Sequence, residues 1–101
     1  MIASLKDEDG YVYAYIEWEI TDGGVTLKKD GEYIYVQTLW VHEDWDGKDA
    51  IFELIPEINE HEFSHNAKWV YWNRDKYGDR VSKIFDRWKL SKKGVRYGQE
   101  E

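Results

Sequence analysis

The pattern of apolar and polar positions predicts a strand in each of two early segments of the chain. Residues 11–20 are rich in aromatic and β-branched side chains, and from Ile16 onward they alternate apolar with acidic positions, which is typical of a strand with one wet face. Residues 33–41 form the longest and most apolar run, which we expect to be central in a sheet. Between them, residues 25–29 predict a short strand between two glycine-containing turns. The three strands are expected to form an antiparallel meander.

Two later segments carry apolar residues at positions i, i+3, i+4 and i+7, which is one face of a helix. The first helix is expected to begin near Gly47 or Lys48, and Pro56 predicts either a kink in it or two short helices. Residues 67–72 predict a fourth, aromatic strand, and residues 95–97 a final edge strand. The two helical stripes consist of Ile51, Leu54, Ile55 and Ile58, and of Val81, Ile84, Phe85 and Trp88.

This order predicts an α+β fold, in which a three-stranded antiparallel meander is followed by helix, strand and helix. The strands on either side of the first helix can lie parallel through a right-handed crossover, which gives a mixed sheet packed against two helices. At 101 residues we expect one domain, with an ordered core at about 10–90 and a polar tail at 91–101.

Composition narrows the class of protein. Aromatic residues make up 17% of the chain, so much of the core must consist of packed rings. There is no cysteine, which excludes disulfides and thiolate chemistry, and no apolar run approaches the roughly 20 residues of a membrane span. The first residues lack the basic and apolar regions of a signal peptide, so we expect a cytoplasmic protein.

The net charge of −7 is divided unevenly along the chain. Residues 1–66 hold 4 Lys/Arg and 16 Asp/Glu, a balance of −12, whereas residues 67–101 hold 10 and 5, a balance of +5. The favoured explanation is that the acidic and basic parts attract each other within the fold. The alternative is a basic surface for an anion beside an acidic surface for a basic partner.

The run from Trp40 to Asp49 follows the central strand, contains an acidic turn with Gly47, and continues into the first helix. This strand, turn and helix resemble the acyl-CoA binding motif of the GNAT superfamily of N-acyltransferases. The resemblance covers about residues 10–90 and lacks the family's N-terminal strand and helix pair on the acceptor side. Such a reduced domain is what we associate with phage or mobile-element genomes.

The resemblance implies a site for acetyl-CoA. In the family, main-chain groups of the central strand bind pantetheine where that strand diverges from its parallel neighbour, and the following turn and helix N-terminus bind the pyrophosphate. Here the strand 39–41 is expected to face residues 71–73. The cofactor-binding residues that follow from the resemblance are Leu39, Trp40, Val41, Gly47, Lys48 and Asn73.

Three residues depart from the family pattern. Asp46 stands where the family has Arg or Gln, and Asp49 replaces a glycine; both carboxylates would repel a pyrophosphate. We favour the interpretation that these two acids complement the helix N-terminus. Phe85 stands where the family has the tyrosine that protonates the leaving thiolate, and a phenyl ring has no proton to give.

The candidate catalytic residues are therefore found elsewhere. Tyr77 precedes the second helical stripe and is the substitute proton donor. His42, just past the central strand, and Glu32 are candidate general bases, with Glu17 as a further candidate. A solvated His42 and a packed Tyr77 are the more ordinary alternatives.

The leading expectation is an acetyltransferase-like protein that transfers an acetyl group to an amine. The alternative is a non-catalytic interaction protein that binds a protein partner through its acidic, aromatic sheet. An uncovered sheet surface also predicts a homodimer. We expect no metal site, although His61 and His65 have a zinc-compatible spacing, and nucleic-acid binding by the basic residues after 73 is disfavoured by the overall acidity.

Overall fold

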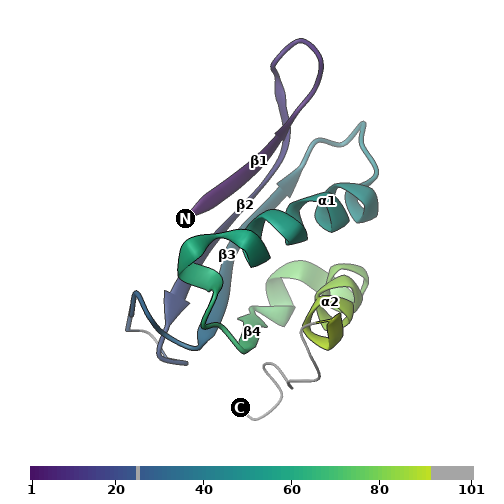
Figure 1. Cartoon of the computed structure of the whole chain (residues 1–101). Helices are drawn as coiled ribbons and strands as arrows, with labels where there is room; N and C mark the ends of the chain where they lie inside the picture. Colours follow the sequence, from purple (N-terminus) through teal and green to yellow (C-terminus); the bar gives the residue numbers. More distant parts are fainter. Residues whose placement is uncertain (25, 92–101) are drawn as a thin grey trace.

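The computed structural model describes residues 1–24 and 26–91, and its sheet has four strands in the order β1, β2, β3, β4 (Figure 1). The strands are β1 Ile2–Lys6, β2 Val12–Thr21, β3 Tyr33–Val41 and β4 Trp69–Trp72. β1, β2 and β3 are antiparallel neighbours, and β3 and β4 are parallel. The predicted α+β arrangement of meander, helix, strand and helix is confirmed.

The meander does not use the strand that we predicted at residues 25–29. Leu27 forms only an isolated bridge with Thr21, and its side chain is 65% exposed. The first strand is instead β1, which the sequence analysis missed. A short loop joins β1 to β2, and Gly10 takes a positive φ of 88° in it, a conformation that glycine adopts at little cost.

Residues 26–32 are held as a loop by close backbone packing. A Cβ atom at Gly31 would lie 2.1 Å from the carbonyl oxygen of Thr21, so only glycine fits there. The amide of Gly31 donates to the carbonyl of Lys28, and the amide of Lys28 donates to that of Ile20. These bonds satisfy the backbone without a ladder, which explains why the predicted strand is wrong.

The first helix, α1, spans Gly47–Glu60 and runs unbroken through Pro56. The alternative of two short helices is therefore wrong. Pro56 removes one helical hydrogen bond from the carbonyl of Phe52, but both residues lie on the exposed side, where water can solvate that carbonyl. A short 3₁₀ helix, η1, follows at Glu62–Ser64.

The second helix, α2, spans Arg74–Ser91 and is interrupted at Gly78, whose φ of 65° and ψ of 176° are not helical. This break separates one turn, which follows β4 at once, from the longer helical part. The predicted edge strand at 95–97 lies outside the described residues. Neither helix among the described residues has the length and apolar character of a membrane span.

Both helices cover the same face of the sheet and share one core with it (Figure 1). The predicted helical stripes point inward: Ile51, Leu54 and Ile58 of α1 and Phe85 and Trp88 of α2 are almost fully buried. Their partners on the sheet include Trp18, Ile34, Val36 and Val70. The indole N–H of Trp88 also donates to Asn59 Oδ1 at 3.1 Å, which ties α2 to α1.

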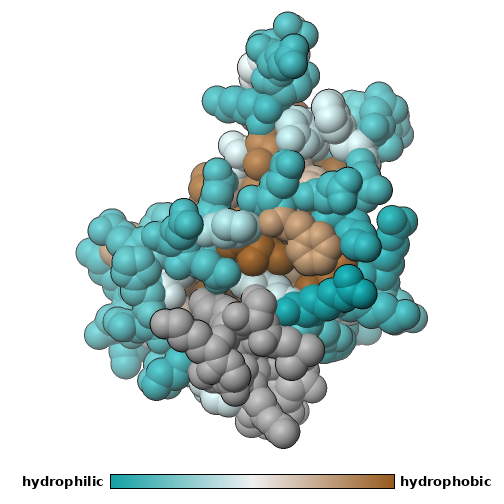
Figure 2. Space-filling model, turned by 45° about the vertical axis from the view of Figure 1, so that its right-hand side comes forward, coloured by the Kyte–Doolittle hydropathy of each residue, from teal (hydrophilic) through white to brown (hydrophobic). Residues whose placement is uncertain are grey.

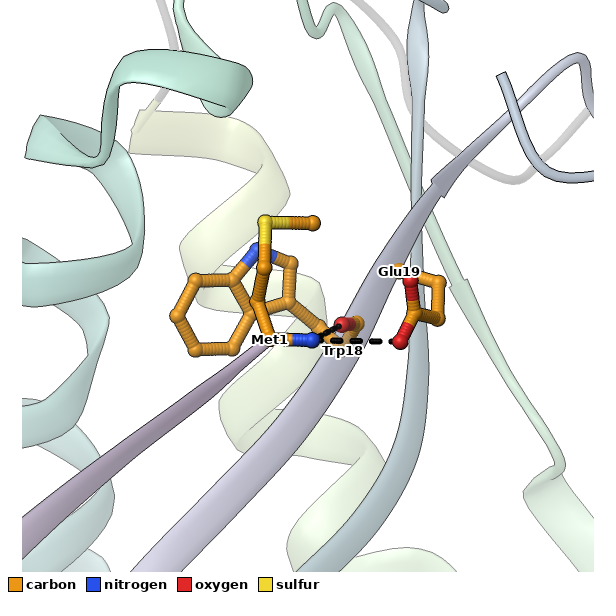
Figure 3. Close-up of polar contacts among 3 residues, drawn as sticks. All are labelled: Met1, Trp18 and Glu19. Atoms are coloured by element: carbon orange, nitrogen blue, oxygen red, sulfur yellow. Dashed lines mark hydrogen bonds and ion pairs between the residues drawn. The ribbon is translucent and has the colours of Figure 1, made fainter. Parts of the chain in front are cut away.

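The start of β1 is fastened to β2 by polar contacts (Figure 3). The ammonium group of Met1 donates to the carbonyl of Trp18 at 2.8 Å and to the carboxylate of Glu19 at 3.1 Å. Ala3 and Leu5 then pack against the core from the same strand. These contacts, rather than strand propensity, place β1 at the edge of the sheet.

Candidate functional site

An open pocket of about 360 Å³ lies between the second half of β3, the start of α1 and the first turns of α2. Its apolar wall comes from all three elements, and its rim carries three cationic residues. Figure 2, turned by 45° from the view of Figure 1, shows apolar residues in the middle of the visible face with hydrophilic ones around them. The residues that line the pocket are Leu39, Val41, Gly47, Lys48, Ile51, Lys76, Tyr77, Arg80, Val81 and Ile84.

The pocket lies where β4 ends, halfway along β3. β4 pairs only with Tyr33–Val36, and Trp72 lies opposite Val36. On the other side of β3 the register with β2 shifts, since Glu17 pairs with Thr38 and Trp18 with Val36. Gln37 is thus the extra residue of a β-bulge, which bends the strand at the point where β4 ends.

The first turn of α2 closes part of the gap that β4 leaves. Lys76 Nζ donates to the carbonyl of Gln37 at 2.8 Å, and the hydroxyl of Tyr77 donates to the same carbonyl at 3.0 Å. Two side chains therefore satisfy a strand carbonyl that has no β4 partner. At this bulge the two side chains of α2 take the place of β4, while the second half of β3 keeps its ladder with β2.

Residues 39–41 do not face residues 71–73 as we expected, because β4 stops too early and its last two residues lie opposite Tyr35 and Val36. Asn73 ends the strand by capping α2: its Oδ1 accepts the backbone N–H groups of Asp75 at 3.0 Å and Lys76 at 3.2 Å. Asn73 was predicted as a cofactor-binding residue, and it is outside the pocket lining. Trp40 points to the other face of the sheet and is 39% exposed.

Tyr77, the predicted proton donor, lines the pocket. Burial raises the pKa of the Tyr77 hydroxyl, and a hydrogen bond with the backbone of Leu39 opposes that rise. The phenol is consequently protonated at neutral pH. Its ring packs edge-on against Phe85, with centroids 5.7 Å apart, and Phe85 itself is fully buried.

The N-terminus of α1 is already occupied by a carboxylate of the chain. Asp46 is the N-cap, and its Oδ1 accepts the amides of Lys48 at 2.9 Å and Asp49 at 3.3 Å. The helix-capping interpretation of Asp46 is confirmed, and Asp49 lies in the first turn of the helix. An anion in this pocket would therefore be held by side-chain cations rather than by these two amides.

The other candidate bases do not line the pocket. The backbone N–H of His42 donates to the carbonyl of Tyr13, and its Nδ1 accepts the amide of Asp44 at 3.1 Å. Glu32 precedes the opposite end of β3 and forms an ion pair with Lys68 at 3.3 Å. Glu17 lies on β2, on the sheet face away from the helices.

The sequence analysis missed part of the pocket. Lys76 and Arg80 were visible as basic residues four positions apart, and Ile51 and Ile84 as helical stripes, but nothing in the sequence joined them at one site. The signal that was available is the excess of cations after residue 73, next to the start of α2.

No metal-binding cluster of three or more His, Cys, Asp or Glu residues occurs in the described part of the chain. The two histidines with zinc-compatible spacing, His61 and His65, lie at helix ends. His61 caps α1, and its Nδ1 accepts the amide of Phe63 at 3.3 Å; His65 ends η1.

Comparisons of the chain with protein-family models, with curated proteins and with solved structures found no match. The function of the pocket must therefore be argued from its geometry and chemistry.

Proposed function

We propose that the pocket beside β3 binds an acyl-CoA-type thioester and that the protein is a reduced, GNAT-like acetyltransferase. The observation that carries the proposal is the end of β4 opposite Val36, which leaves the second half of β3 without β4 beside it, next to a pocket with three cations. This combination suits a ligand with a narrow, amide-containing arm and an anionic end. Four of the six cofactor-binding residues that the resemblance implies line this pocket, namely Leu39, Val41, Gly47 and Lys48.

The thioester arm would lie along the second half of β3. Leu39 and Val41 offer apolar surface and strand backbone, and Ile51, Val81 and Ile84 face them across the pocket. An acyl chain and a pantetheine arm are largely apolar with a few amides, which matches this lining.

The phosphate groups would lie at the rim, near Lys48, Lys76 and Arg80. All three side chains are on the exposed part of their elements, so they can contact an anion without being desolvated beforehand. Because Asp46 occupies the α1 amides, Arg80 and Lys48 supply most of the anion recognition. The proposed mode thus differs from one based on a glycine-rich turn.

The reaction would proceed by direct attack. The nitrogen of a neutral amine attacks the thioester carbonyl carbon, the new C–N bond forms, and the C–S bond breaks. The amine loses a proton to water or a base, and the Tyr77 hydroxyl, protonated at neutral pH, gives a proton to the departing sulfur. Positioning the two reactants would supply much of the acceleration.

Titration calorimetry with acetyl-CoA, together with thermal unfolding, tests the binding step. At a ligand concentration of about 100 Kd the melting temperature should rise by on the order of 10 °C. Arg80→Gln should weaken binding by roughly tenfold, since a charge-assisted contact to phosphate contributes about 1.5–3 kcal/mol. Lys83→Gln is the matched control, because Lys83 lies on the same helix outside the pocket lining.

Two further ligands separate the parts of the proposal. Coenzyme A should bind with an affinity similar to that of acetyl-CoA, whereas pantetheine, which lacks the pyrophosphate, should bind more weakly and be insensitive to Arg80→Gln. The absence of any acetyl-CoA binding at millimolar concentration would overturn the proposal. Binding without release of free thiol in the presence of amines would leave a thioester-binding protein without transferase activity.

A further inference from the structure

The face of the sheet away from the helices is built from aromatic rings. Strand alternation and the β2–β3 and β3–β4 pairings place six aromatic side chains there, five of them half-buried and Trp40 39% exposed. Both helices lie on the opposite face, so no helix of the described chain covers these rings (Figure 1). We call this surface the open face; its rings are Tyr15, Tyr33, Tyr35, Trp40, Trp69 and Tyr71.

The rings of the open face support one another across the strands. Tyr15 lies 5.7 Å from Trp40, and Tyr35 lies 4.8 Å from Tyr71 between ring centroids. The hydroxyl of Tyr71 lies 2.7 Å from Thr21 Oγ1 and donates to the carbonyl of Gly24 at 2.8 Å. The surface is therefore preorganised, and little side-chain entropy remains to be lost on binding.

The charge on this surface is negative. Glu17 and Glu19 follow Tyr15 at every second position of β2, so they point to the same side of the sheet as its ring. Glu19 contacts the ammonium group of Met1, and Glu17 lies opposite Thr38 beside Tyr15. Across the four strands Lys6, the last residue of β1, is the only lysine or arginine.

Aromatic rings beside carboxylates fit a cationic partner. A guanidinium group can stack on a tyrosine or tryptophan ring while its N–H groups donate to a carboxylate, and this planar stacking favours arginine over lysine. A second copy of the chain fits less well. Two open faces packed against each other would bring the glutamates of both copies together, and like charges at an interface are costly.

We propose that the open face is a docking surface for an arginine-rich, extended segment of a partner protein. Guanidinium groups stack on the rings around Trp40, and Glu17 accepts their hydrogen bonds. The surface is separate from the pocket, which lies on the helix side of the sheet. Loss of one activity would therefore not abolish the other.

A hexa-arginine peptide is the probe, with hexalysine and hexaglutamate peptides as comparisons. Calorimetry should show binding of hexa-arginine that is at least about threefold tighter than that of hexalysine and no binding of hexaglutamate. In NMR spectra the indole N–H signal of Trp40 should shift, whereas those of the buried Trp18 and Trp88 should not.

Variants test whether the open face is responsible. Trp40→Ala and Glu17→Gln should each weaken hexa-arginine binding by roughly fivefold. Phe52→Ala and Glu57→Gln are the matched controls on exposed positions of α1, and binding to them should stay within twofold of the parent protein.

Three results would overturn the proposal. Equal losses in the open-face and α1 variants would show attraction to the overall negative charge instead of a site. Equal affinity for the arginine and lysine peptides would exclude stacking. A dimeric mass in light scattering that becomes monomeric with Trp40→Ala would assign the surface to a second copy of the chain.

Discussion

The two halves of β3 differ in the strands that pair with them. Tyr33–Val36 lies between β2 and β4, whereas within the described residues Gln37–Val41 has only β2 as a strand neighbour. In the first half Ile34 is fully buried, and the strand serves the core. In the second half Leu39 and Val41 are half-buried and line a pocket. One strand thus supplies both the stability of the sheet and the proposed site.

The difference comes from two local events at the middle of the strand. The bulge at Gln37 changes the direction of β3, and the Asn73 cap turns the chain after β4 into α2. Side chains of the first helical turn then replace strand backbone as partners of the Gln37 carbonyl. A side chain can move away from a ligand, whereas a paired strand cannot do so without breaking its ladder.

The largest expected effect is a difference in how much the two halves of β3 contribute to the stability of the protein. Ile34→Ala should lower the free energy of unfolding by about 2–5 kcal/mol, because the side chain is fully buried and its removal leaves a cavity. Leu39→Ala should cost less than about half as much, since water already reaches the pocket wall. Urea unfolding monitored by tryptophan fluorescence measures both changes.

In ligand binding the order of the two variants should be the reverse of their order in loss of stability. Leu39→Ala should weaken acetyl-CoA binding, whereas Ile34→Ala should leave the affinity of the folded protein near that of the parent. Equal stability losses in the two variants would contradict the distinction between a paired and an open half of β3.

The sequence predicted the elements whose pattern is long and local. Apolar spacing located α1 within a residue of its start, and the helix between two apolar strands predicted the parallel pair of β3 and β4. β1 was missed because it is short, contains Ala3 and Lys6, which strands disfavour, and owes its place to packing and to the Met1 contacts. The strand predicted at residues 25–29 is wrong because the side chain of Leu27 is exposed and does not join the core.

The candidate site was less predictable, because it depends on contacts between segments far apart in the chain. The capping role of Asp46 could be inferred from its position before a helix. The bulge at Gln37 could not, since it is defined by the register against Glu17 and Trp18. The position of Lys76, Tyr77 and Arg80 could not be inferred either, because it depends on the residue, Asn73, at which β4 ends and α2 begins.

A smaller effect is expected at the start of α1, where the open half of β3 leads into the helix. Asp46→Ala should lower stability by about 1 kcal/mol, because the amides of Lys48 and Asp49 lose their acceptor. Asp46→Ser should retain most of that stability, since serine also caps helices, while removing a negative charge near the pocket.

Binding then distinguishes the charge of Asp46 from its capping role. Asp46→Ser should strengthen acetyl-CoA binding severalfold at low salt, and the gain should shrink as salt is added. Calorimetry at two salt concentrations is the measurement. Unchanged affinity in Asp46→Ser would mean that the phosphate groups lie away from the α1 N-terminus.

The smallest effect concerns the hydrogen bond that joins Tyr77 to the open half of β3. Tyr77→Phe should lower stability by about 0.5–1.5 kcal/mol near neutral pH, toward the lower end because Lys76 still donates to the Gln37 carbonyl. The folded-state pKa of Tyr77 is raised above its ordinary value of 10.0, chiefly by burial.

A raised pKa favours folding while the hydroxyl is protonated. The contribution of Tyr77 is therefore fully present below about pH 10 and is lost as the pH rises through the folded-state pKa. The stability difference between the parent protein and Tyr77→Phe should be constant from pH 7 to 9 and decrease above about pH 10. Tyr11→Phe, at a side chain that is 73% exposed, is the control for loss of a hydroxyl. If the Tyr77→Phe difference grew at alkaline pH, folding would lower the pKa of Tyr77 instead of raising it, and burial would not be the dominant influence on this hydroxyl.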